Sequence, residues 1–256
     1  MIDPNSLTPV QRIGDIWVKR EDLFTVADVS GGKARACYLL MKEARVGVVT
    51  SGSRFSPQVG IVANIARSLE LHCRFHTPTG EKTPEINDAI SCGAEHIAHK
   101  AGYNSVIAAR CRNDASRRGW TEIPFGMQCL QAVTSTAFQV RNLPEQIRRL
   151  VVPVGSGMTL AGILHGIQDL QRKDIKLLGV IVGADPVRRL DKWAPAQWRR
   201  NVQLIRCREP YHLPSVAALH GINLDPHYEA KCLPYIKPRD CFWIVGIRKV
   251  QNHCNG

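Results

Sequence analysis

Short apolar runs that suit β-strands alternate along this chain with segments whose apolar residues repeat at helical spacing. The strand candidates are residues 46–50, 71–76, 94–98, 150–154, 175–183 and 242–247. Strands that are separated by helices pair in the same direction, whereas strands joined by tight turns pair antiparallel. The pattern therefore predicts an α/β fold built mainly on parallel sheets.

The chain of 256 residues is long enough for one large domain or two smaller ones. We expect residues 1–44 and 141–256 to form a larger domain, into which residues 45–140 are inserted as a smaller α/β domain. The cleft between two such domains is a natural place for a ligand.

Membrane, secreted and metal-binding classes receive no support from the sequence. No apolar run approaches the length of a membrane-spanning helix, and the first residues lack the basic-then-apolar pattern of a signal peptide. The nine cysteines are scattered, with no Cys-x-x-Cys pair. We therefore expect a cytoplasmic protein with reduced cysteines, no membrane association and no bound metal.

The charge is strongly positive, with 34 basic and 22 acidic residues, a net charge of +12 and a pI near 9.5. Two stretches concentrate it. One is 187–209, with Trp193 and Trp198 between its basic residues, and the other is 110–120. Arginines beside aromatic rings can hold phosphates and stack on bases. The alternative is an ordinary solvated surface, so nucleic acid stays an open partner class.

A glycine turn follows the strand candidate at 150–154. The turn Gly155-Ser156-Gly157 precedes a helical pattern, so its backbone N–H groups and the helix dipole favour an anion such as a phosphate. Ser156 and Thr159 add hydroxyl donors. The spacing matches neither the Walker sequence nor the full dinucleotide-binding pattern.

Lys33 follows a glycine pair at the start of another predicted helix. From such a fixed position a lysine can reach into a cleft and form a Schiff base with a cofactor aldehyde. The alternative interpretation is a solvated lysine on a helix surface, and Lys33 by itself does not decide between the two.

Several motifs occur together in one order. They are Lys-Arg-Glu-Asp-Leu at 19–23, Gly-Gly-Lys-x-Arg at 31–35, a serine-rich loop at 51–58, Gly-Ser-Gly-x-Thr-x-Ala-Gly at 155–162, Tyr-His-Leu-Pro-Ser at 211–215 and the segment 224–231. Across residues 16–247 they resemble the fold-type II pyridoxal-phosphate enzymes, the tryptophan synthase β-like group. Within this group they resemble 1-aminocyclopropane-1-carboxylate deaminase and D-cysteine desulfhydrase. The resemblance implies a two-domain fold, pyridoxal 5'-phosphate in the interdomain cleft, an amino-acid substrate and a homodimer.

The resemblance also implies roles for the matched residues. Lys33 matches the Schiff-base lysine, Glu229 matches an acid beside the pyridine nitrogen, and Ser56 belongs to the loop that contacts the substrate carboxylate. The catalytic candidates are Lys33, Tyr228, Tyr211 and Ser56. The cofactor-binding candidates are Lys33, Gly155, Ser156, Gly157, Met158, Thr159 and Glu229. The substrate-binding candidates are Ser53, Ser56 and Gln58.

Two positions depart from the family pattern. Gly32 stands where the family usually has asparagine, and Pro57 stands within a loop that commonly reads Ser-Asn-Gln or Ser-Asn-His. Proline has no N–H and no side-chain amide, so one clamp on the substrate or cofactor is missing.

The function that we expect is that of a pyridoxal-phosphate-dependent lyase or deaminase acting at the α-carbon of an amino acid. Two alternatives stay open. One is a decarboxylase or lyase for an amino acid attached to a nucleic-acid base or nucleotide, as in DNA hypermodification. The other is a non-catalytic relative that binds the cofactor or nucleic acid.

Overall fold

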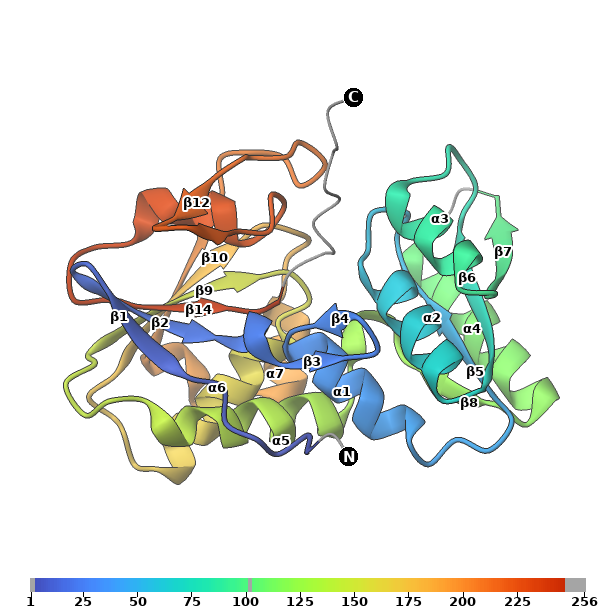
Figure 1. Cartoon of the computed structure of the whole chain (residues 1–256). Coiled ribbons are helices and arrows are strands. Elements are labelled where there is room, and N and C mark those ends of the chain that lie inside the picture. The colour runs from blue at the N-terminus through green and yellow to red at the C-terminus, as the bar shows by residue number, and fades with distance from the viewer. Residues whose placement is uncertain (1–2, 101–102, 247–256) are drawn as a thin grey trace.

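The computed structural model describes residues 3–100 and 103–246 and contains two main sheets, each covered by helices (Figure 1). The larger sheet has six strands in the order β1 (Val10–Ile13), β2 (Ile16–Arg20), β14 (Cys241–Ile244), β9 (Arg149–Val154), β10 (Lys176–Ile181) and β11 (Val202–Arg206). All its neighbouring strands are parallel except the β1–β2 hairpin.

The two faces of the larger sheet have different covers. Val152 and Val154 point to one face, where they pack in a core with the helices α1 (Gly32–Met41), α5 (Leu130–Phe138) and α6 (Met158–Asp169). Val151 points to the other face and packs against the C-terminal segment around η5 (Glu229–Tyr235). This alternation follows from the two-residue period of a strand.

The smaller sheet is entirely parallel and has the order β7 (Glu95–His99), β6 (His72–Pro78), β5 (Gly47–Ser51) and β8 (Thr121–Ile123). Val48 packs in the core shared with α2 (Gln58–Ser68), whereas its neighbour Val49 packs against α4 (Asn104–Arg118). The two helices therefore cover opposite faces of this sheet.

Short elements complete the described chain. They are η1 (Glu21–Leu23), β3 (Thr25–Val26), β4 (Val29–Ser30), α3 (Pro84–Ser91), η2 (Phe125–Met127), η3 (Gln139–Asn142), α7 (Val187–Trp193), η4 (Trp198–Arg200), β12 (Ala218–Leu219) and β13 (Ile222–Asn223).

The predicted α/β class with mainly parallel sheets is confirmed, and each of the six strand candidates corresponds to a strand. The last candidate ends early, because β14 stops at Ile244 and the two following residues turn towards a pocket. Ile247 lies outside the described residues.

The two sheets draw on different parts of the chain. All strands of the smaller sheet lie within 47–123, and all strands of the larger sheet lie outside that range. Because α5 packs against α1 and α6 of the larger layer, we propose a domain boundary before this helix rather than at residue 140.

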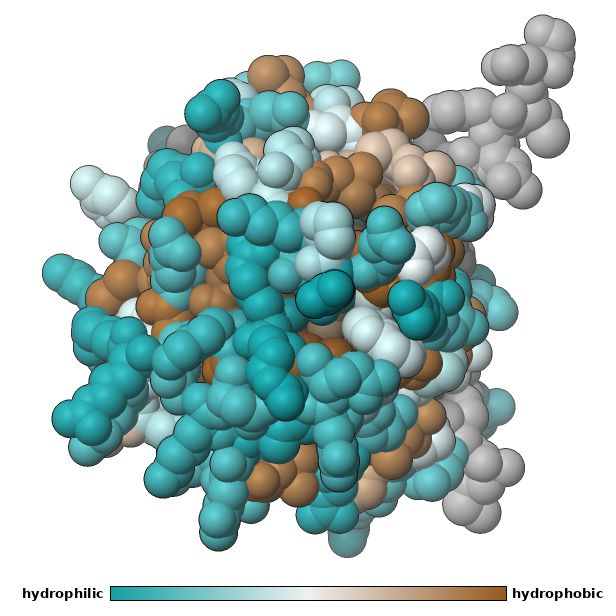
Figure 2. All heavy atoms as spheres, turned by 90° about the vertical axis from the view of Figure 1, so that its left-hand side faces the viewer, coloured by the Kyte–Doolittle hydropathy of each residue, from teal (hydrophilic) through white to brown (hydrophobic). Residues whose placement is uncertain are grey.

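Hydrophilic side chains cover most of the face of the molecule that is turned away from the smaller sheet, with hydrophobic side chains scattered between them (Figure 2). Within the described residues, every helix is too short or too polar to cross a lipid bilayer.

Candidate active site

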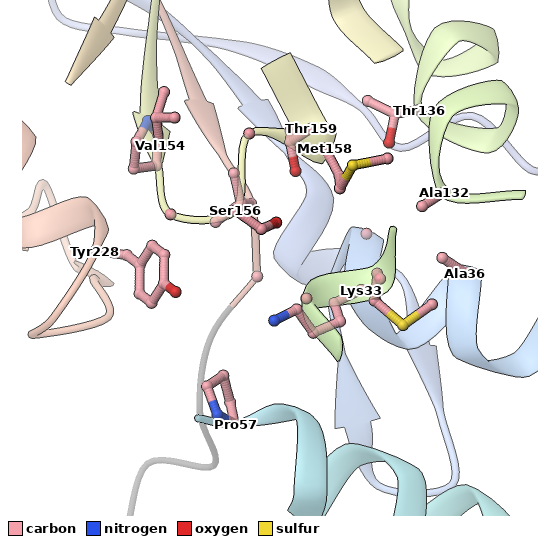
Figure 3. A pocket seen from close by; sticks show the side chains of 18 of the residues that line it. Lys33, Ala36, Pro57, Ala132, Thr136, Val154, Ser156, Met158, Thr159 and Tyr228 are labelled. Atoms are coloured by element: carbon pink, nitrogen blue, oxygen red, sulfur yellow. The ribbon is translucent and has the colours of Figure 1, made fainter. Parts of the chain in front are cut away.

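One pocket is lined by residues of both sheet layers. Its walls come from the first turn of α1, the start of α2, the turn between β9 and α6, and the residues after β14. It encloses about 810 Å³ of empty space, counting its open mouth. In Figure 3 the Lys33 amine and the Tyr228 hydroxyl point into the same open space, above Pro57.

The glycine pair before Lys33 lets three backbone segments meet. Gly31 has a φ of 95°, and a Cβ there would lie 2.4 Å from the Cα of Gly246. The Gly32 N–H donates to the carbonyl of Val245 at 3.0 Å, which ties the start of α1 to the end of β14. A Cβ on Gly32 would approach Glu21 Oε2 at 3.2 Å. A side chain at position 32 would therefore require that carboxylate to shift slightly.

A buried ion pair stabilises the segment that carries Lys33. The guanidinium of Arg35, two residues after Lys33, pairs with the carboxylate of Glu21, and both side chains are almost fully buried. The hydroxyl of Thr8 donates to the same carboxylate, and Arg35 lies 4.3 Å above the ring of Phe24. The two motifs at 19–23 and 31–35 thus meet through these side chains.

Lys19, from the first of these motifs, is also buried. Its amine donates to the carbonyl of Thr8 and to Asn142 Oδ1, each at 2.8 Å. Burial lowers the pKa of Lys19 to about 8. Lys19 therefore anchors the N-terminal segment against η3.

The turn at 155–157 has the shape of an anion cradle. Gly157 is the N-cap of α6 in a left-handed conformation, with φ 89°, and no side chain caps the helix. The first N–H groups of α6 thus have no side-chain acceptor, and the dipole favours negative charge there. A Cβ on Gly155 would lie 2.7 Å from the Tyr228 hydroxyl, so only glycine lets this ring pack against the turn. Such a cradle fits the phosphate of a cofactor.

The two candidate tyrosines occupy different places. Tyr228 lines the pocket, and Tyr211 packs edge-on against it, with ring centroids 5.7 Å apart. The Tyr211 hydroxyl donates to the carbonyl of Phe55 at 3.1 Å, so it joins the C-terminal segment to the serine-rich loop. Tyr211 is not among the residues that line the pocket.

Glu229 lies just behind the pocket wall and is fully buried. Its Oε1 accepts hydrogen bonds from the backbone N–H groups of Val245 and Gly246, at 2.9 and 3.2 Å. Its Oε2 has no hydrogen-bond partner within the described chain. Burial, and then the charge of Asp225, raises the pKa of Glu229 well above its ordinary value. A buried oxygen without a partner has the chemistry to accept a bond from a ring N–H.

The serine-rich loop contributes less to the lining than the sequence predicts. Pro57 lines the pocket, whereas Ser53 and Ser56 do not. Gln58 is fully buried, and its Nε2 donates to Thr50 Oγ1 at 3.0 Å and to the carbonyl of Pro124 at 2.8 Å. As the first residue of α2 it packs between β5 and β8, so the structure does not place Gln58 on the pocket surface.

Asp225 and Gly126 are among the pocket residues that the analysis of the sequence missed. Asp225 accepts hydrogen bonds from the N–H groups of His227 and Tyr228, at 2.8 and 3.1 Å, and so orients the tyrosine segment. The Asp225-Pro226 turn was the sequence signal that could have identified this residue. Gly126 packs against Ser156, and its φ of 65° required a glycine that no local pattern marked.

Among curated proteins, the chain is similar to biosynthetic L-threonine dehydratases. The relative from Pasteurella multocida is 27% identical over 189 residues, covering 70% of this chain and 36% of the relative. The relative from Corynebacterium glutamicum is 25% identical over 182 residues, covering 67% of this chain and 40% of the relative. The chain therefore spans less than half the length of these relatives.

Solved structures share the fold. An ACC deaminase homologue matches with a TM-score of 0.78 at 21% identity, over 94% of this chain and 89% of the homologue. Escherichia coli diaminopropionate ammonia lyase, in complex with D-serine, matches with a TM-score of 0.70 at 15% identity. This match covers 95% of this chain and 85% of the lyase. Threonine deaminase isoform 2 of Solanum lycopersicum matches with a TM-score of 0.64 at 15% identity. This match covers 96% of this chain and 84% of the deaminase. The predicted tryptophan synthase β-like fold is thereby confirmed.

The family assignment rests on a match over most of the sequence. A family model described as pyridoxal-phosphate dependent enzyme matches residues 2–221, which include Lys33 and the glycine turn at 155–157. The expected cofactor, pyridoxal 5'-phosphate, is the cofactor of that family. The chain belongs to the family of pyridoxal-phosphate dependent enzymes.

Proposed function

We propose that this protein is a lyase or deaminase that uses pyridoxal 5'-phosphate to break a bond at the α-carbon of an amino acid. The observation that carries the proposal is that Lys33, the turn at 155–157 and Tyr228 line one pocket. When bound, the cofactor ring withdraws the electrons released at the α-carbon. The names of the similar proteins, which include threonine dehydratase and diaminopropionate ammonia lyase, support an elimination from an amino acid.

Different residues would bind different parts of the cofactor. The N–H groups at the start of α6, with the hydroxyls of Ser156 and Thr159, hold the phosphate. Lys33 would provide the amine that attaches the cofactor, and the unpartnered Oε2 of Glu229, behind the pocket wall, would accept a hydrogen bond from the ring N–H. Because Gly155 and Gly157 lack side chains, the phosphate and the Tyr228 ring can approach the turn closely.

Proton transfer falls to two side chains that point into the pocket. With the cofactor bound, the Lys33 amine would take the proton from the substrate α-carbon or return one to it. The Tyr228 hydroxyl points into the same space and can protonate a leaving group or orient the substrate (Figure 3). Tyr211 acts through Tyr228, against which it packs. Ser53 and Ser56 remain proposed substrate contacts of the loop that ends at Pro57.

The basic segment 187–209 gives little support to a nucleic-acid-linked substrate. Trp198 is buried, and its indole N–H donates to Asp191 at 3.1 Å. Arg199 pairs with the same carboxylate at 2.6 Å, and Arg206 donates to the carbonyl of Gly183. Because these groups serve the fold, we restrict the proposal to free amino acids. A homodimer and a cytoplasmic location remain predictions.

The attachment of the cofactor gives the first test. The protein is loaded with pyridoxal 5'-phosphate, reduced with borohydride and digested, and the modified peptide is identified by mass spectrometry. We expect the label on Lys33, with none in Lys33→Ala and full labelling in Lys42→Ala, which removes an exposed lysine of the same region. A label on another lysine would end the proposal.

The substrate class gives the second test. The loaded protein is assayed for release of ammonia and a 2-oxo acid from threonine, both serine enantiomers, diaminopropionate, cysteine and 1-aminocyclopropane-1-carboxylate. We expect turnover of at least one, abolished by Lys33→Ala and reduced by Tyr228→Phe. Release of carbon dioxide and an amine, without ammonia or a 2-oxo acid, would instead identify a decarboxylase.

A further inference from the structure

A second hollow lies on the smaller sheet, between α4 and the strands β6 and β7. It encloses about 970 Å³ of empty space, counting its open mouth, and shares no lining residue with the candidate active site. Its floor consists of Arg74, His76 and Asp114, which are 9%, 3% and 5% exposed. Arg110 and Arg117 form part of its exposed rim.

The floor carries one carboxylate, and arginines already neutralise it. Asp114 Oδ1 accepts hydrogen bonds from Arg74 Nη1 at 3.3 Å and from Arg118 Nε at 3.1 Å. Its other oxygen lies 3.1 Å from His76 Nε2. Arg74 also reaches Glu95 at 3.0 Å, while its buried Nε has no hydrogen-bond partner in the described chain.

A chain of hydrogen bonds runs from this carboxylate to the rim. His76 Nδ1 lies 2.8 Å from His99 Nε2, and His99 Nδ1 lies 3.1 Å from Arg110 Nη1. Arg110 can only donate and Asp114 accepts, so each histidine must be neutral with its hydrogen on Nε2. Burial lowers the pKa of both histidines, in agreement with this assignment.

This chain argues against a metal ion. Both ring nitrogens of each histidine already have hydrogen-bond partners, so neither offers a lone pair to a cation. Among the described residues there is no cluster of three or more potential metal ligands. The histidines instead hold Arg110 in place at the mouth of the hollow.

The remaining charge facing the hollow is positive. Arg74, Arg110 and Arg117 line it, whereas Asp114 is its one acidic lining residue among those described. Basic residues in the last turn of α4 complement the helix dipole, but that accounts only for Arg117 and its neighbour. Arg74 lies on β6 and already pairs with Asp114 and Glu95. Arg110 lies in the middle of α4 and contacts the neutral His99, so its charge at the mouth has no acidic partner within the described chain.

We propose that this hollow binds a dianionic phosphate group, either inorganic phosphate or the phosphate of a small monoester. The guanidinium fork matches the spacing of phosphate oxygens and binds them by two charge-assisted hydrogen bonds. Asn113 and Ser116 line the same space and supply neutral donors. The open mouth leaves room for the organic part of an ester.

The test measures binding of inorganic phosphate by titration calorimetry at constant ionic strength. The protein is first loaded with pyridoxal 5'-phosphate and the free cofactor is removed by gel filtration, so that the cradle at 155–157 is occupied and the hollow is not. We expect saturable binding, weakened by on the order of tenfold or more in the variant Arg110→Gln/Arg117→Gln, which loses two charge-assisted donors. The control Arg12→Gln/Arg45→Gln removes the same charge from exposed positions outside the hollow and should bind as the parent does.

A second variant keeps every arginine. Asn113→Asp places a negative charge on the exposed rim and should also weaken binding, with an unchanged Tm. Absence of saturable binding by the parent protein, or equal weakening in the Arg12→Gln/Arg45→Gln control, would overturn the proposal.

Ribose 5-phosphate distinguishes the two sources of the phosphate group. If it binds at least as tightly as inorganic phosphate, the hollow accepts an ester, and if it binds more weakly, the hollow is a site for free phosphate. Failure of both probes to bind would refute the assignment.

Discussion

The buried pair of Glu21 and Arg35 supports a quantitative prediction about what holds Lys33 in position. The change is Glu21→Gln, which preserves shape and removes one charge. Both partners have side chains that are 1% exposed, so the variant leaves the Arg35 cation without its partner in the interior. Arg35 Nε and Nη2 already lack hydrogen-bond partners within the described chain, which leaves no second acceptor to replace the carboxylate.

Loss of one partner from a buried pair costs about 3–5 kcal/mol. For a chain of this size that corresponds to a fall in Tm on the order of 10 °C. The double variant Glu21→Gln/Arg35→Met removes both charges and keeps the aliphatic contact with Phe24, so it should be more stable than Glu21→Gln alone.

Urea unfolding of Glu21→Gln, Arg35→Met and the double variant, followed by circular dichroism, measures these differences. The matched control is Glu43→Gln, which breaks an exposed pair with Lys42 at 3.8 Å and should change stability by less than about 0.5 kcal/mol. If Glu21→Gln lost no more than this control, or if the two single changes were additive, the pair would not be what orders the start of α1.

Three further outcomes follow from the structure. Gly155→Ala should weaken binding of pyridoxal 5'-phosphate on the order of tenfold or more in an absorbance titration, since its Cβ would overlap Tyr228 at 2.7 Å; Gly183→Ala, with nothing nearer than 3.5 Å, should not. Burial lowers the pKa of Lys19 to about 8 from an ordinary 10.5, so the unfolded chain binds more protons between these values. The free energy of unfolding should therefore rise with pH in that window, by up to about 1.4 kcal/mol per pH unit, and Lys19→Met should remove this contribution in urea titrations. Alkylation of the native protein, mapped by mass spectrometry, should modify Cys92 and Cys207 well before the buried thiols. The buried thiols are Cys37, Cys73, Cys111, Cys232 and Cys241.

The fold was predictable because its strands are strongly apolar and its turns carry glycine. The run at 150–154 and the glycines after it mark a strand, a turn and a helix start within a dozen residues, and β9 and α6 follow that pattern. β11 was missed because polar residues alternate with apolar ones in it and it is only partly buried. Short amphipathic edge strands give a weak local signal.

The candidate site was predictable only where one short segment carries the chemistry. Lys33 and the turn at 155–157 have recognisable local settings, and both line the pocket. Gln58 belongs to a recognisable loop, but its side chain is held by Thr50 and the carbonyl of Pro124, contacts that depend on the packing of β5 and β8. The hollow beside α4 joins residues from three elements, so no spacing in the sequence marks it.

The strand order explains why these distant residues form one pocket. β14, the last described strand, lies between β2 and β9 and runs parallel to both. The carboxyl ends of all three strands therefore meet at one edge of the sheet, where open α/β sheets place their ligands. From that edge β2 leads towards Lys33, β9 leads into the phosphate cradle, and β14 leads to Gly246, whose Cα would lie 2.4 Å from a Cβ on Gly31. Because the middle strand of the three is the last described strand, the placement of the lysine beside the cradle depends on segments from both ends of the described chain.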